Sequence, residues 1–144
     1  VVTGKPIVMG GSLGRTEATG RGVMVTSLAA MEKLKINPYK ATCAVQGFGN
    51  VGSWAARLLA ERGLKIQAVS DLGGAYYNEN GIDIEKAVAY RDKNKGSLEG
   101  FAEATKISGD ELLTLPVDVL VPAATEDVIT ASNAPKIQAK LIVE

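Results

Sequence analysis

The chain has 144 residues, of which 46% are hydrophobic and 22% are charged, and its 16 basic side chains balance 16 acidic ones. This composition excludes intrinsic disorder and a coiled coil, and the zero net charge argues against a nucleic-acid binder or a membrane-surface protein. No apolar run approaches the ~18 residues that a membrane-spanning helix needs. With no histidine and one cysteine, the chain has no Ser-His-Asp or Cys-His site, no His-ligated metal and no thiolate zinc site. It also has no internal disulfide, which is typical of a cytoplasmic protein.

The first segment, residues 1–15, is rich in glycine and is predicted to be a loop. A helix is predicted over 16–34, with Thr16 as its N-cap and a broad apolar stripe. Gly20 and Gly22 lie in its first turns and each lowers helix stability by about 1 kcal/mol relative to alanine. We therefore expect another element to approach this helix closely at the two glycines.

Short apolar segments then alternate with helical ones. Strands are predicted at 41–45, 64–70, 75–77, 117–121 and 140–143, and helices at 50–62, 84–92 and 133–139, with a single turn at 111–113 and a loop over most of 93–109. The strands are almost wholly apolar, as strands buried on both faces are. This order predicts an α/β fold: a Rossmann-like, doubly wound, mainly parallel sheet with helices on both faces.

The two ends of the chain lack the polar, tapering composition of natural termini. The chain starts at Val1 and stops at Glu144, inside a predicted strand. We therefore expect residues 1–144 to be one domain cut from a longer chain, with a sheet that is incomplete at its C-terminal end.

A glycine fingerprint follows the first predicted strand. The segment Gly47-Phe48-Gly49-Asn50-Val51-Gly52 fits the pattern G-x-G-x-x-G, opens a predicted helix, and is followed 19 positions later by Asp71 at the end of the next strand. The first glycine permits a tight turn, the second leaves room for a pyrophosphate, and the third lets helix and strand pack closely. The helix start adds free N–H groups for the phosphates. The alternative is a glycine-rich turn in an α/β domain that binds no dinucleotide.

Asp71 bears on the choice of cofactor. Its carboxylate is placed to accept hydrogen bonds from the adenosine ribose and would repel a 2′-phosphate. The residues that follow it, Leu72-Gly73-Gly74, include no arginine or lysine. NAD is therefore the expected cofactor, and NADP remains possible. The alternative for Asp71 is a plain turn-forming residue before the glycine pair.

Several segments, in order and with preserved spacing, resemble the cofactor domain of glutamate dehydrogenases and their leucine, phenylalanine and valine relatives. The segments are Thr3-Gly4-Lys5-Pro6, Gly10 to Gly22, Gln46 to Gly52, Ala68-Val69-Ser70-Asp71 and Val121-Pro122-Ala123-Ala124. The resemblance runs essentially from end to end. It is therefore far more specific than the glycine fingerprint alone.

This resemblance implies roles for individual residues at a dinucleotide site. Thr19 would contact the nicotinamide carboxamide and Asn50 would seat the nicotinamide end, while Arg15 would lie near the active-site cleft. The remaining implied cofactor-binding residues are Gly47, Phe48, Gly49 and Val51 at the pyrophosphate, Asp71 at the ribose, and Ala123, Ala124 and Thr125 in the loop bordering the cofactor. Two alternatives stay open: Thr19 as a buried helix residue bonded to a backbone carbonyl, and Ala123-Ala124 as packing only.

The resemblance also implies an activity: reversible, NAD(P)-dependent oxidative deamination of L-glutamate to 2-oxoglutarate and ammonia, in a cytoplasmic, hexameric enzyme that contacts neither nucleic acid nor membrane. The family's catalytic lysine and aspartate lie in an earlier domain, and no segment here matches them. No catalytic residue is assigned, and the chain alone is expected to be inactive. The alternatives are a leucine- or phenylalanine-type dehydrogenase and a nucleotide-binding regulatory module without catalysis.

Three other features have plain interpretations. Cys43, on a buried strand, is expected in the core. Tyr76 and Tyr77 are expected to pack at the surface on a short edge hairpin. The segment 93–95 is expected to be a solvated turn.

Overall fold

The computed structural model describes residues 4–144. Its helices are α1 (Arg15–Lys33), α2 (Asn50–Glu61), α3 (Ile84–Lys93) and α4 (Gly109–Leu113), with 3-10 turns η1 (Ile7–Met9), η2 (Pro38–Lys40) and η3 (Ala134–Lys136). Its strands are β1 (Thr42–Gln46), β2 (Lys65–Asp71), β3 (Gly74–Tyr77), β4 (Thr105–Ile107), β5 (Val119–Pro122) and β6 (Leu141–Ile142). No helix in this part of the chain is both long enough and apolar enough to span a membrane.

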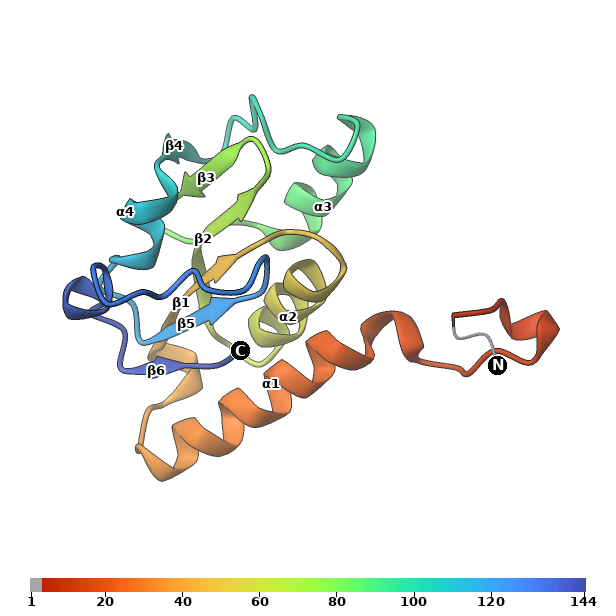
Figure 1. The fold of residues 1–144 in the computed structure, drawn as a ribbon, viewed down its shortest axis with the longest axis horizontal. Helices are drawn as coiled ribbons and strands as arrows, with labels where there is room; N and C mark the ends of the chain where they lie inside the picture. The colour runs from red at the N-terminus through yellow and green to blue at the C-terminus, as the bar shows by residue number, and fades with distance from the viewer. Residues whose placement is uncertain (1–3) are drawn as a thin grey trace.

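The strands form one mixed sheet in the order β4-β3-β2-β1-β5-β6 (Figure 1). The pairs β1–β2, β1–β5 and β5–β6 are parallel, and β3 is antiparallel to both of its neighbours. At the centre, Val45 of β1 lies opposite Val69 on one side and Val121 on the other. The predicted α/β fold with a mainly parallel sheet is confirmed.

Helices cover both faces of this sheet because alternate strand residues point to opposite sides. Cys43 and Val45 belong to the larger core cluster, to which α1, α2 and α3 contribute buried side chains. Ala44, between them, belongs to a smaller cluster under α4. Cys43 is fully buried, as predicted, and burial raises the pKa of its thiol well above the usual range.

The edge of the sheet differs from the prediction. Residues 105–107 form β4, which pairs with β3 where only a loop was expected. Thr-Lys-Ile is a short, mostly exposed strand and so carries little apolar periodicity. Since β4 is the edge strand, β3 lies one place inside, and Tyr76 is a core residue that is 2% exposed. The prediction of surface packing for Tyr76 is wrong.

Two helix predictions are also corrected. The helix expected at 133–139 is reduced to the single 3-10 turn η3, and Ile137 is already extended. Pro135 has no N–H to donate and fits only a first helical turn. At the start of α1 the N-cap is Gly14 in a left-handed conformation, and Thr16 lies inside the helix.

Helices α1 and α2 cross closely at Gly20. A Cβ there would lie 2.6 Å from the Cβ of Trp54 and 2.8 Å from the backbone nitrogen of Ala55, whereas a Cβ at Gly22 would meet no atom within 4 Å. The expected close approach is therefore made at Gly20 and not at Gly22.

This difference gives a matched pair of variants. We expect Gly20→Ala to lower the free energy of unfolding by about 1–3 kcal/mol, because the two helices must move apart. Gly22→Ala should raise it by up to ~1 kcal/mol, because alanine favours the helix. Urea unfolding of both variants measures this, and equal changes at the two sites would contradict the close crossing.

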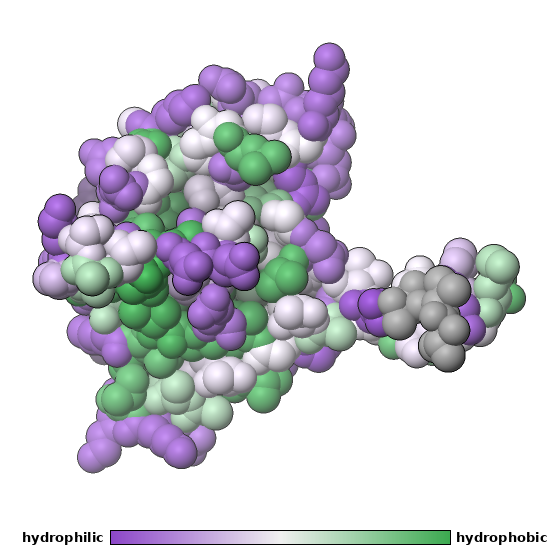
Figure 2. All heavy atoms as spheres, in the orientation of Figure 1, coloured by the Kyte–Doolittle hydropathy of each residue, from purple (hydrophilic) through white to green (hydrophobic). Residues whose placement is uncertain are grey.

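The segment before α1 extends away from the sheet (Figure 1). It carries four exposed apolar side chains, Ile7, Val8, Met9 and Leu13. In the space-filling view hydrophobic residues also gather over the part of the sheet around β5 and β6 (Figure 2).

Candidate functional site

A cleft of about 1260 Å³ opens at the carboxyl ends of the parallel strands. The strand order reverses there: β2 lies on one side of β1, and the chain later returns to place β5 on the other. Ligands of open α/β sheets bind at such a switch point. Nine predicted site residues border the cleft: Gly47, Phe48, Gly49, Asn50, Val51, Asp71, Ala123, Ala124 and Thr125.

The glycine turn between β1 and α2 has the geometry that its three glycines predict. Gly47 has φ +97°, a left-handed conformation that favours glycine. A Cβ at Gly52 would overlap the Gly47 carbonyl oxygen and lie 2.7 Å from the carbonyl carbon, so helix and turn meet without a side chain between them. A Cβ at Gly49 would meet no atom within 4 Å. The surface at Gly49 is therefore open to an approaching group.

The same turn presents a row of free hydrogen-bond donors. The backbone N–H groups of residues 48–52 have no acceptor in the part of the chain that the structure describes, whereas the N–H of Gly47 donates to Ser70 Oγ at 3.0 Å. Residues 49–52 include the first turn of α2, where no intrahelical acceptor exists and the helix dipole is positive. Free N–H groups at a helix start form a binding site for phosphate or another anion.

The loop after β5 closes the turn from the other side. The N–H of Ala123 donates to the Gln46 carbonyl at 2.7 Å, and a Cβ at Gly47 would lie 2.7 Å from the Ala123 carbonyl oxygen and 2.9 Å from the Ala124 Cβ. Two segments far apart in sequence therefore form one wall of the cleft. Thr125 is exposed at its rim.

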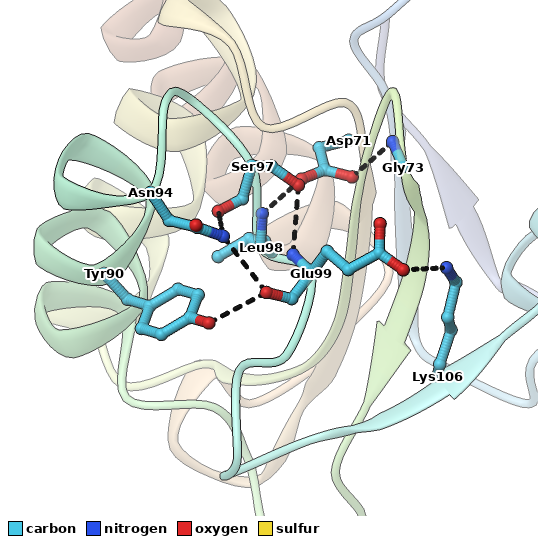
Figure 3. Close-up of polar contacts among 8 residues, drawn as sticks. All are labelled: Asp71, Gly73, Tyr90, Asn94, Ser97, Leu98, Glu99 and Lys106. Carbon is cyan, nitrogen blue, oxygen red and sulfur yellow. Dashed lines mark hydrogen bonds and ion pairs between the residues drawn. The ribbon is translucent and has the colours of Figure 1, made fainter.

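Asp71 ends β2 at the border of the cleft, and its carboxylate already binds backbone (Figure 3). Oδ1 accepts the N–H of Gly73 at 2.7 Å, and Oδ2 accepts the N–H of Leu98 at 2.5 Å. Each carboxylate oxygen has two lone pairs, so capacity for ribose hydroxyls remains. Asp71 is thus a turn-forming residue and an anchor for the segment after α3, and it still faces the cleft.

The anchored segment, residues 94–99, is held by further polar contacts (Figure 3). Asn94 Nδ2 donates to the carbonyls of Ser97 and Glu99, and the Tyr90 hydroxyl donates to the Glu99 carbonyl at 2.8 Å. The Glu99 carboxylate pairs with Lys106 Nζ at 3.1 Å. Within this segment Gly96 borders the cleft. The exposure of Lys93 and Lys95 confirms the solvated turn predicted at 93–95, while the contacts of Asn94 fix the residues that follow it.

Lys106 is a cation that the sequence did not reveal near Asp71. A Cβ at Gly74 would lie 2.8 Å from Lys106 Cε and 3.7 Å from Nζ, so the ammonium group lies beside the turn that follows Asp71. Lys106 stands 35 positions after Asp71 in sequence. Only the pairing of β4 with β3 brings the two together.

Two predicted residues lie outside the cleft border. Arg15 and Thr19 are exposed on the first turns of α1, and their implied roles stay predictions. Thr16 borders the cleft instead, and its carbonyl accepts a hydrogen bond from Asn50 Nδ2 at 2.8 Å. Asn50 thereby ties the start of α2 to α1.

Arg91 is a further cleft residue that the sequence analysis missed. It lies in the last turn of α3, where a basic residue is ordinarily explained by the helix dipole, so the sequence gives no separate signal for it. Between residues 4 and 144, no group of three His, Cys, Asp or Glu side chains is placed to hold a metal ion.

Comparisons with known proteins agree with this geometry. A profile of the family described as Glutamate/Leucine/Phenylalanine/Valine dehydrogenase matches residues 10–144. The whole chain is 52% identical to a glutamate dehydrogenase of Thermotoga maritima and covers 35% of it. It superimposes in full on 33% of a hetero-hexameric glutamate dehydrogenase chain from Thermus thermophilus, with a TM-score of 0.90 and 32% identity.

A more distant structure shares the fold. For an L-tryptophan dehydrogenase from Nostoc punctiforme the TM-score is 0.64 and the identity 27%, over 90% of this chain and 34% of that one. The chain therefore spans about a third of the length of the relatives it matches.

Proposed function

Since the chain belongs to the Glutamate/Leucine/Phenylalanine/Valine dehydrogenase family, we propose that residues 1–144 are the dinucleotide-binding domain of an NAD(P)-dependent amino-acid dehydrogenase. The observation that carries this proposal is the row of N–H groups at residues 48–52 that find no acceptor among residues 4–144, beside the open surface of Gly49. A pyrophosphate has the charge and the acceptor oxygens that this row requires. The bound nicotinamide would supply the hydride-accepting carbon, and this domain would bind and orient it.

For the whole enzyme we propose the reversible oxidative deamination of L-glutamate to 2-oxoglutarate and ammonia. The support is the 52% identity with a protein named glutamate dehydrogenase. The opening Thr3-Gly4-Lys5-Pro6 also favours glutamate over the leucine and phenylalanine branches, although Thr3 lies outside the described residues. We also propose that the whole enzyme is a hexamer, which the hexameric relative supports. A cytoplasmic location is part of the same proposal, and the single, buried cysteine, which forms no internal disulfide, supports it.

The experiment that tests the binding role is calorimetric titration of the chain with NAD and with ADP-ribose. ADP-ribose retains the pyrophosphate and the adenosine but lacks the nicotinamide. We expect one saturable site for each ligand and mutual competition. A chain that is folded by circular dichroism but binds neither ligand would overturn the proposal.

NAD is the proposed preferred cofactor, and Leu72 provides the test. Its side chain is fully exposed on the turn after Asp71, so Leu72→Arg introduces a cation without a burial cost. A charge-assisted contact with the 2′-phosphate contributes about 1.5–3 kcal/mol. The dissociation constant of NADP should therefore fall relative to that of NAD, so that the ratio of the NAD to the NADP dissociation constant rises about tenfold or more. Asp71 is left in place because its carboxylate also holds Gly73 and Leu98.

Leu72→Gln is the control for this variant, since it adds polarity without charge and should leave the ratio near its wild-type value. Both ratios are measured at the same salt concentration. A wild-type preference for NADP would contradict the argument from Asp71. It would identify Lys106, beside Gly74, as the cation to examine.

A further inference from the structure

Arg91 makes a partly buried contact with the middle of the glycine fingerprint. Its Nη1 donates to the Phe48 carbonyl at 2.5 Å, and its guanidinium carbon lies 5.4 Å from the centre of the Phe48 ring. The arginine side chain is 19% exposed, and Phe48 is 2% exposed. The end of α3 is thereby fixed to a turn 43 positions earlier in the chain.

This hydrogen bond sets the orientation of one peptide unit in the turn. The Phe48 carbonyl and the Gly49 N–H belong to the same trans peptide, in which the C=O and N–H bonds point in opposite directions. With the carbonyl held by Arg91, the Gly49 N–H points away from the guanidinium. That N–H is one of the donors without an acceptor in the described chain.

The charge of Arg91 is largely matched by its neighbour. Nε and Nη2 both donate to Asp92 Oδ1, at 3.1 and 2.8 Å. All three guanidinium nitrogens thus have partners, and a carboxylate lies beside the cation. The guanidinium therefore links the Phe48 carbonyl to the Asp92 carboxylate in a fixed orientation, and it is not a free cation available to a phosphate.

We propose that Arg91 is a positioning residue of the dinucleotide site: it locks the Phe48–Gly49 peptide so that the Gly49 N–H faces the pyrophosphate. The inference rests on the proposed binding function and adds a residue to it. Without the arginine the peptide can rotate, and its carbonyl oxygen would then turn toward the anion and repel it.

The test measures the affinity of the full 144-residue chain for NAD, ADP and adenosine. We expect Arg91→Ala to raise the dissociation constants of NAD and ADP about tenfold and to leave that of adenosine, which has no phosphate, within about twofold. Arg91→Lys keeps a charged donor but not the planar fork of the guanidinium, so it should recover only part of the loss. In the ¹H–¹⁵N spectrum of the free protein, the Gly49 amide signal should move or broaden in Arg91→Ala and return toward its wild-type position in Arg91→Lys.

Arg62 offers a matched control. Like Arg91 it stands at the end of a helix, here α2, but its side chain is exposed and does not border the cleft. Arg62→Ala should leave NAD affinity within about twofold. Equal losses of NAD affinity in Arg62→Ala and Arg91→Ala, or a loss of adenosine affinity as large as the loss of NAD affinity, would overturn the positioning role. Wild-type protein that binds NAD while Arg91→Ala binds it equally well would overturn the inference alone, whereas wild-type protein that binds no NAD would overturn the proposed function as well.

Discussion

Replacing Gly49 with valine should weaken NAD binding by at least tenfold while leaving the fold intact. The backbone at this position is extended, with φ −75° and ψ −156°, and a Cβ there would meet no atom of residues 4–144 within 4 Å. The valine therefore costs little in the free protein. Its branched side chain would occupy the space in front of the free N–H groups, where the pyrophosphate must come close. The loss corresponds to about 1.4 kcal/mol or more of binding free energy.

Gly49→Ala is the graded companion of this variant, because it adds only the first carbon of the side chain. We expect an intermediate loss of NAD affinity, with unfolding midpoints for both variants close to that of the wild type. Calorimetry gives the affinities and urea unfolding gives the midpoints. Unchanged NAD affinity in a folded Gly49→Val protein would show that the pyrophosphate does not approach this turn.

Gly52→Ala is expected to have the largest effect on stability. Its Cβ would overlap the Gly47 carbonyl oxygen and lie 3.4 Å from a methyl group of Val45, and both neighbours belong to the rigid junction of β1 and α2. Backbone atoms cannot move aside as the end of a flexible side chain can. We therefore expect the free energy of unfolding to fall by about 3 kcal/mol, which is at the upper end of the usual cost of overpacking.

Gly109→Ala is the control for Gly52→Ala. Gly109 is also in the first turn of a helix, but a Cβ there would meet no atom within 4 Å, so this substitution should be neutral or slightly stabilising. The two midpoints in urea are compared directly. A Gly52→Ala protein as stable as Gly109→Ala would contradict the close packing of the turn against α2.

The central part of the site could be predicted because its determinants are local. Each of the three glycines is required by its own local geometry. The backbone is left-handed at Gly47, the surface is open at Gly49, and the helix touches the turn at Gly52. The apolar strands around them indicated the parallel arrangement, and the carboxyl ends of β1 and β5 then had to meet. Asp71 was recognised from its spacing, although its bond to Leu98 was not foreseen.

The missed features depend on contacts between distant segments. The strand β4 has one partner strand and little buried surface, so its three residues carry no pattern of their own. Lys106 reaches the turn after Asp71 only through that pairing, and Arg91 reaches Phe48 only because α3 packs beside α2. Arg15 and Thr19 illustrate the reverse case, since their roles came from resemblance and the geometry of the cleft does not include them.

The most direct test of the dinucleotide site is the map of backbone amide shifts when NAD is added to the isotope-labelled chain. We expect the largest changes at residues 48–52, with further changes at Asp71 and in the loop 123–125, because these groups border one cleft and include the free donors. The β3–β4 edge around Tyr77 and Thr105 should change little. Saturable binding whose largest shifts fall at that edge, or no shift at residues 48–52 at saturating NAD, would contradict a dinucleotide site on the glycine turn.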